Sequence, residues 1–191
     1  GCPSICQMDG FELTRFGVVG AGLMGSGIAE VCARAGLDVV VGEVDAGRCE
    51  DAQRRIEQSL GRAASRGKIT AEEHDSVLGR ITYTTRLEDL ADRQFVVEAV
   101  VENAEAKTSV FAMLDRIIES DEAVIASNTS SIPIMKLAMS TRRPESVIGL
   151  HFFNPVPVLK LVEVVPSLLT SPQTIEMTEH LAKDLLDKRV I

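Results

Sequence analysis

The stretch GLHFFNPVPVLKLVEV, residues 149–164, places His151, one of three histidines in the chain, in an aromatic run interrupted by prolines. A histidine here is either a core residue with satisfied ring nitrogens or a group that accepts and returns a proton near neutral pH. Glu163 lies as far after Pro157 as His151 lies before it. If the chain folds back at this proline, the two side chains face each other with Cβ atoms about 4.5–5.5 Å apart. The histidine alone does not decide between the two interpretations.

A second candidate site is the segment VVGAGLMGSGIAE, in which Gly20, Gly22 and Gly25 have G-x-G-x-x-G spacing. The segment follows a predicted strand and opens a predicted helix, and Glu43 ends the next strand, which is the context of a dinucleotide-binding turn. The first glycine permits the tight turn, the second lets the backbone approach a pyrophosphate, and the third allows close helix–strand packing. The helix N-terminus supplies free N–H groups for the phosphates.

Glu43 favours NAD over NADP. Its carboxylate can accept hydrogen bonds from the adenine ribose hydroxyls, whereas its charge repels a 2′-phosphate, and no arginine follows it directly. Leu23 and Met24, within the same loop, join the glycines as expected cofactor contacts. The alternative is a glycine-rich turn that binds no ligand.

The elements that must position these residues follow a regular alternation. Short runs of valine and isoleucine alternate with helical patterns, as is typical of a parallel sheet buried on both faces. The β-α-β order predicts an α/β domain with a Rossmann-type, doubly wound and mostly parallel sheet. The expected strands are 15–20, 38–44, 81–85, 94–101 and 122–128, and the expected helices are 23–36, 46–66, 104–119 and a short helix capped by Thr70.

The pattern changes near the end of the sequence. Residues 146–153 and 159–165 are expected strands, and the connection between them is too short for a parallel crossover, so this pair should be antiparallel. A last helix is expected after Ser171, and residues 188–191 begin another strand. The abrupt end of the sequence suggests a truncated or partly represented protein.

Composition argues against several classes of function. Hydrophobic residues make up 45% and charged residues 25% of the 191 residues, which is ordinary for a globular domain. The net charge of −8 argues against a nucleic-acid surface as the main function. No apolar run approaches the roughly 20 residues of a membrane span, and the start of the chain lacks a secretory signal. These features favour a cytoplasmic protein.

The four cysteines give no strong signal of a metal site or a disulfide framework. They show no C-x-x-C spacing and are interpreted as reduced thiols, and no metal is expected. A metal or redox role for Cys2 and Cys6 remains as a minor alternative.

Residues 14–191 resemble the NAD-binding domain of the 3-hydroxyacyl-CoA dehydrogenase family, particularly its bacterial 3-hydroxybutyryl-CoA dehydrogenases. The resemblance rests on GAGLMGSGIAE, VVEAVVEN, ASNTSS and GLHFFNPVPVLKLVEVV, which occur in family order. It implies reversible, NAD-dependent oxidation of a short-chain L-3-hydroxyacyl-CoA to the 3-ketoacyl-CoA. It also implies a helical C-terminal domain, absent from this sequence, that closes over the acyl-CoA and forms a homodimer. Residues 1–13 lie outside the resemblance and are expected to be a leader or an added segment.

The resemblance also assigns roles to single residues. His151 becomes the general base, and Glu163 holds its tautomer and stabilises the imidazolium. Ser130 is implied to hydrogen-bond the substrate oxygen and to lie at the cofactor; taken alone it would be a helix N-cap. Asn154 is implied to lie near the nicotinamide and would otherwise be a turn residue.

The resemblance also implies contacts with the cofactor and with CoA. Glu102 and Lys107 match cofactor contacts, although composition alone would make them an ordinary surface pair. Ser59 and Arg66 match positions that touch CoA, and Lys68 could replace the lysine often found at the second of these. The basic segment 46–68 suits a polyanionic ligand, but a solvated helix face explains the same charges equally well.

Two other functions compete with this assignment. One is a related NAD-dependent dehydrogenase that acts on a non-CoA hydroxy acid or sugar acid. The other is a non-catalytic NAD-binding protein on the same fold.

Overall fold

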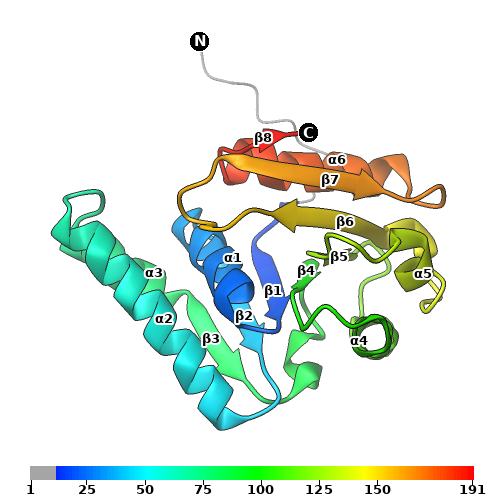
Figure 1. Ribbon diagram of the computed structural model, residues 1–191, viewed down its shortest axis with the longest axis horizontal. Coiled ribbons are helices and arrows are strands. Elements are labelled where there is room, and N and C mark those ends of the chain that lie inside the picture. The colour runs from blue at the N-terminus through cyan, green and yellow to red at the C-terminus, as the bar shows by residue number, and fades with distance from the viewer. Residues whose placement is uncertain (1–11) are drawn as a thin grey trace.

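The computed structural model describes residues 12–191, so the expectations for Cys2, Cys6 and residues 1–11 lie outside the described part. Eight strands form one sheet in the order β3-β2-β1-β4-β5-β6-β7-β8 (Figure 1). Among the strand pairs in residues 12–191, β6–β7 alone is antiparallel. The predicted Rossmann-type sheet and its antiparallel end are therefore confirmed. Within these residues, no helix has the length and apolar character needed to cross a membrane.

Each expected strand is present, in most cases with shorter ends. The strands are β1 Arg15–Val19, β2 Asp38–Gly42, β3 Ile81–Thr84, β4 Phe95–Glu98, β5 Val124–Ser127, β6 Val147–Phe152, β7 Leu161–Pro166 and β8 Arg189–Val190. The helices are α1 Leu23–Arg34, α2 Ala46–Ser65, α3 Ala71–Gly79, α4 Ala104–Ile117, α5 Ile134–Ala138 and α6 Pro172–His180.

The short elements are the ones that the sequence pattern did not predict. Helix α5 and the 3-10 turns Leu87–Leu90 and Pro144–Ser146 are too short to show a helical hydrophobic period. The last predicted helix ends in a π-helical turn, Leu181–Leu185. In contrast, the predicted cap of α3 is confirmed, because the Thr70 hydroxyl accepts a hydrogen bond from the Glu73 N–H at 3.0 Å.

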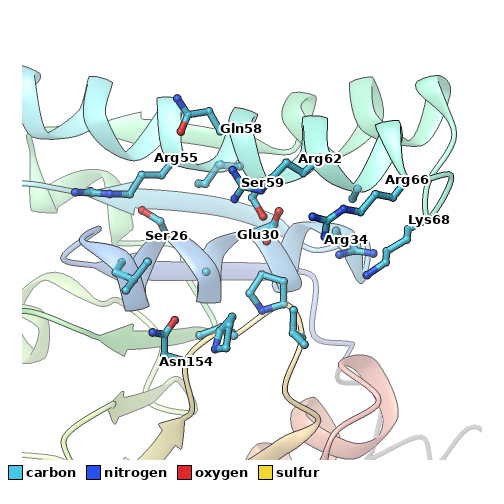
Figure 2. A pocket seen from close by; sticks show the side chains of 18 residues that line it. Ser26, Glu30, Arg34, Arg55, Gln58, Ser59, Arg62, Arg66, Lys68 and Asn154 are labelled. Carbon is cyan, nitrogen blue, oxygen red and sulfur yellow. The ribbon is translucent and has the colours of Figure 1, made fainter.

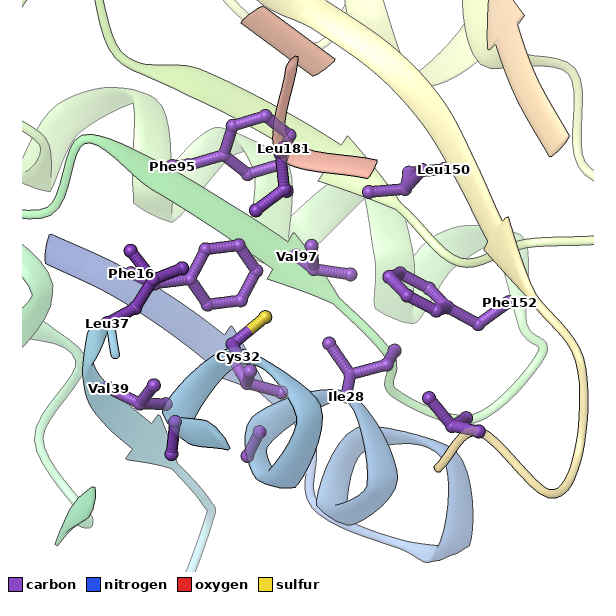
Figure 3. Packing of buried hydrophobic residues seen from close by; sticks show 14 of the residues in the cluster. Phe16, Ile28, Cys32, Leu37, Val39, Phe95, Val97, Leu150, Phe152 and Leu181 are labelled. Carbon is purple, nitrogen blue, oxygen red and sulfur yellow. The ribbon is translucent and has the colours of Figure 1, made fainter. Parts of the chain in front are cut away.

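The sheet is covered on both faces, which explains its continuous apolar strands. Because successive side chains of a strand point to opposite faces, Phe16 and Val18 join one buried cluster and Val19 joins the other. Helices α1, α2, α3 and α6 contribute to the first cluster, and α4 and α5 contribute to the second. Figure 3 shows the first cluster, in which Ile28 and Cys32 of α1 pack toward the sheet.

This topology gathers the candidate residues at one edge. Strands β1, β2, β4, β5 and β6 are parallel to one another, so their carboxyl ends meet there. The chain reverses its direction of winding between β1 and β4, and ligands of open α/β sheets bind at such a switch point. The glycine loop follows β1, and His151 lies near the end of β6.

Candidate functional site

The glycine loop has the geometry that each of its three glycines was predicted to provide. Gly20 has a positive φ of 88°, which favours glycine. A Cβ on Gly25 would lie 1.8 Å from the Gly20 carbonyl oxygen, so helix α1 can approach the loop only without a side chain there. A Cβ on Gly22 would meet no atom of the described chain within 4 Å. The backbone at Gly22 is thus open to a ligand.

Glu43 lies just after β2 and reaches across to the glycine loop. Its Oε1 accepts a hydrogen bond from the Ala21 N–H at 2.6 Å, and its Oε2 accepts one from the Val44 N–H at 3.0 Å. A carboxylate has about four lone-pair sites, so further acceptor positions remain for ribose hydroxyls. The loop and its acidic neighbour therefore fit a dinucleotide such as NAD.

The glycine loop borders a cavity of about 810 Å³. Its walls come from the loop, the end of β2, the segment after β4 and one side of α4. Leu23 and Met24, the expected cofactor contacts in this loop, line it. The wall on the α4 side is apolar and includes Val100, Val110 and Met113, which suits the aromatic parts of a dinucleotide.

Lys107 is not a surface residue, which corrects the interpretation from composition alone. Its side chain is 1% exposed, and its Nζ lies 2.6 Å from Oε2 of Glu98, which is fully buried at the end of β4. Glu98 also accepts hydrogen bonds from the Ser127 hydroxyl at 2.6 Å and the Val100 N–H at 2.8 Å. This network joins β4, β5 and α4, and it includes the backbone of Val100, which lines the first cavity. Whether Lys107 contacts the cofactor stays a prediction.

Glu102 and the loop after β5 form a second polar group at the same edge. The Glu102 carboxylate accepts hydrogen bonds from the hydroxyls of Thr129 and Ser131, and its Oε2 lies 3.9 Å from the Lys107 Nζ. Ser130 lies exposed between these two hydroxyl residues. It is not the N-cap of α5, because that helix begins at Ile134 and its N-cap is Pro133, with no side-chain capping hydrogen bond.

His151 and Glu163 face each other across the antiparallel pair, in the register that their spacing about Pro157 predicts. The His151 Nδ1 lies 3.8 Å from the Glu163 Oε2, and the two side chains are 20% and 43% exposed. The Phe153 ring meets the imidazole edge-on at a centroid distance of 4.7 Å. Within residues 12–191 the buried Nδ1 has no hydrogen-bond partner.

The His151–Glu163 distance of 3.8 Å is longer than a hydrogen bond. The opening alternative, a core histidine with satisfied ring nitrogens, does not describe this side chain. Its Nδ1 is unsatisfied and its nearest charged neighbour is a carboxylate.

A second cavity, of about 640 Å³, lies between α1, α2 and the loop that joins β6 to β7 (Figure 2). Ser59, Arg66 and Lys68 all line it, so the structure brings the three predicted CoA contacts together. Asn154 also lines this cavity rather than the first. Leu23 and Arg55 line both cavities, so the two cavities adjoin each other at these residues.

Three residues at these sites were not singled out from the sequence. Glu98 carries the buried network, Glu30 lines the second cavity, and Arg55 donates a hydrogen bond to the Ala21 carbonyl at 3.3 Å. Only Glu98 gave a signal, since an acidic residue at the end of a buried strand needs a partner. The other two are single charges in helical patterns that place them equally well on a solvated face.

The sequence matches a known family of NAD-binding domains, as the geometry of the glycine loop suggests. A family model for the NAD-binding domain of 3-hydroxyacyl-CoA dehydrogenase matches residues 15–191. The chain is 54% identical to a 3-hydroxybutyryl-CoA dehydrogenase of Mycobacterium tuberculosis over 94% of its own length. It is 46% identical to a probable 3-hydroxybutyryl-CoA dehydrogenase of Bacillus subtilis over 85% of its length and 56% of that relative. It spans 63% of the Mycobacterium relative, less than two thirds.

Solved structures show the same fold. The crystal structure of FadB2 of M. tuberculosis superposes with a TM-score of 0.93 at 54% identity, covering 94% of this chain and 63% of that one. The (S)-3-hydroxybutyryl-CoA dehydrogenase of Ralstonia eutropha superposes with a TM-score of 0.91 at 40% identity, covering 94% and 63%.

Proposed function

Because this chain belongs to the NAD-binding domain family of 3-hydroxyacyl-CoA dehydrogenases, we propose that its protein reversibly oxidises a short-chain L-3-hydroxyacyl-CoA, 3-hydroxybutyryl-CoA, to the 3-ketoacyl-CoA. The observation that carries the proposal is the pairing of His151 with Glu163 at the same sheet edge as the glycine loop. A non-catalytic NAD-binding protein does not need such a pair.

The chain's own groups account for the proton that this reaction releases. NAD, when bound, supplies the acceptor for the hydride that leaves the substrate carbon. The His151 Nδ1 is directed at Glu163, so Nε2 is the atom that takes the hydroxyl proton. Glu163 stabilises the resulting imidazolium, and the Ser130 hydroxyl donates a hydrogen bond to the substrate oxygen.

The second cavity supports a CoA thioester as the substrate. Arg66 and Lys68 supply positive charge for its phosphates, and Ser59 supplies a hydroxyl. Because this cavity adjoins the cofactor cavity at Leu23 and Arg55, an extended thioester bound there can direct its acyl end toward the sheet edge. We assign to Asn154, which lines the second cavity, the role of orienting the reacting groups of the substrate.

The test is acetoacetyl-CoA-dependent oxidation of NADH by the intact protein, with NADPH and a non-CoA 3-keto acid as comparisons. We expect turnover with acetoacetyl-CoA and NADH, and at least tenfold lower kcat/KM with NADPH because Glu43 repels a 2′-phosphate. Reduction of the non-CoA acid without reduction of acetoacetyl-CoA would instead establish the related-dehydrogenase alternative.

The family resemblance leads us to propose a cytoplasmic homodimer in which a helical C-terminal domain follows this NAD-binding domain. Light scattering on the intact protein tests the dimer, because a monomeric mass at micromolar concentration contradicts it.

A further inference from the structure

Glu30 is a buried carboxylate that the proposed reaction does not use. It lies on α1 with a residue exposure of 1%, and neither of its carboxylate oxygens has a hydrogen-bond partner within residues 12–191. Burial raises the pKa of Glu30, while the Ser59 hydroxyl, which is close to the carboxylate but outside hydrogen-bond geometry, and the positive charges of Arg34 and Arg62 oppose the rise. Buried polar groups are nearly always hydrogen-bonded, so an unpartnered pair of oxygens calls for an explanation.

The second cavity supplies the context for this carboxylate. Glu30 is among its lining residues, and Figure 2 shows Ser59 and Glu30 directed toward each other across the space between α2 and α1. The other charged residues of the same wall are cations, namely Arg34, Arg55, Arg62, Arg66 and Lys68. Such a wall attracts a polyanion, and a carboxylate weakens that attraction. Anion binding therefore does not account for Glu30.

We propose that the Glu30 carboxylate binds an uncharged hydrogen-bond donor of the ligand in this cavity, an amide N–H or a hydroxyl of the pantetheine arm of a CoA thioester. The inference rests on the proposed function. The pantetheine arm joins the anionic nucleotide to the thioester and carries both types of donor. An extended ligand of this kind places its phosphates on the arginines and its neutral arm against the single carboxylate among the described residues that line the cavity.

The proposal predicts a specific pattern of affinities. A hydrogen bond between a charged group and a neutral donor contributes enough that its loss weakens binding about 10- to 100-fold. Glu30→Leu should therefore weaken the binding of free CoA by that factor. It should leave the affinity for adenosine 3′,5′-bisphosphate unchanged or increased, since this probe carries two of the three phosphates of CoA and lacks the arm. Glu30→Gln keeps one acceptor oxygen and should lose less CoA affinity.

The experiment is isothermal titration calorimetry of CoA and of adenosine 3′,5′-bisphosphate with the intact protein and its variants. Glu57→Leu is the matched control, because it removes an exposed carboxylate from α2 that lines neither cavity. The control should change neither affinity by more than about twofold. Thermal unfolding of each variant verifies that the fold is retained.

The outcomes separate the inference from the proposed function. If Glu30→Leu changes the affinities for CoA and for adenosine 3′,5′-bisphosphate equally, or changes neither, Glu30 does not have the proposed role. The proposed function still holds in that case, provided that the wild-type protein binds CoA and reduces acetoacetyl-CoA. A wild-type protein that neither binds CoA nor reduces acetoacetyl-CoA overturns the proposed function and this inference with it.

Discussion

Gly22 and Gly25 lie three residues apart in one loop but are required for different physical reasons. A Cβ on Gly25 would overlap the Gly20 carbonyl, whereas a Cβ on Gly22 would point into open space where a ligand approaches. One glycine is required by the fold, and the other is required only by the ligand.

Alanine substitutions should separate these two requirements. We expect Gly25→Ala to lower the free energy of unfolding by about 3 kcal/mol, because the backbone of the loop must shift. Gly22→Ala should change it by less than about 1 kcal/mol and yet weaken NAD binding at least tenfold. Urea unfolding and fluorescence titration with NADH measure the two quantities. Loss of stability in Gly22→Ala would contradict the assignment.

Glu30 makes a separate prediction about stability and pH. Burial raises its pKa above the ordinary value of 4.5, so the folded state binds a proton more tightly than the unfolded state does. The contribution of this bound proton to the free energy of unfolding is fully present below pH 4.5, and it is lost as the pH rises through the pKa that Glu30 has in the folded state. Glu30→Gln should thus be more stable than wild type at pH 8, and the difference should shrink toward pH 4.5. A difference that does not vary with pH in thermal unfolding would contradict this account.

At this scale, residues with a fixed local spacing could be predicted and isolated charges could not. The three glycines follow a short pattern, and Glu163 could be paired with His151 by counting from Pro157. Glu30 and Arg55 acquire their surroundings only when α1 and α2 pack together, which no local pattern encodes. The N-cap interpretation of Ser130 was wrong because α5 begins only at Ile134, after Pro133.

At the scale of elements, the loop between β6 and β7 forms part of the second cavity and is held by a buried lysine. The Lys188 Nζ donates hydrogen bonds to the carbonyls of Val156 at 2.9 Å and Leu159 at 2.5 Å. The residue is 7% exposed, and burial lowers the pKa of its ammonium group. Lys188 therefore fixes the loop from a position directly before β8, the strand at one edge of the sheet.

Removing this ammonium should loosen the loop. We expect Lys188→Met to lower the free energy of unfolding by about 1–3 kcal/mol, since two hydrogen bonds to a charged donor are lost. Lys160→Met is the control, because Lys160 pairs with Asp187 at the exposed surface, where solvent screens the charges. Urea unfolding of both variants makes the comparison. An equal effect of the two substitutions would show that Lys188 does not hold the loop.

The long elements were predictable because their periodicity is strong, and the short ones were not. Helix α2 has twenty residues, and Ala52, Ile56, Leu60 and Ala63 form a buried stripe along it, as the pattern indicates. Helix α5 has five residues and is fixed instead by packing against β6.

At the scale of the whole molecule, one edge of the sheet assembles the site. The parallel strands bring the glycine loop, the segment after β4, the loop after β5 and His151 to that edge, and antiparallel β7 returns Glu163 to it. The alternation of strands and helices predicted this arrangement from the sequence. The buried network of Glu98 and Lys107 depends on contacts between β4 and α4 and was not predicted.

We propose that His151 accepts the substrate proton and that the glycine loop binds the cofactor independently of it. The most direct measurement compares His151→Gln with wild type in acetoacetyl-CoA-dependent NADH oxidation and in NADH titration. We predict that kcat falls by at least a hundredfold, consistent with the loss of a general base, while the Kd for NADH changes by less than threefold. Turnover by His151→Gln equal to that of wild type would contradict the claim.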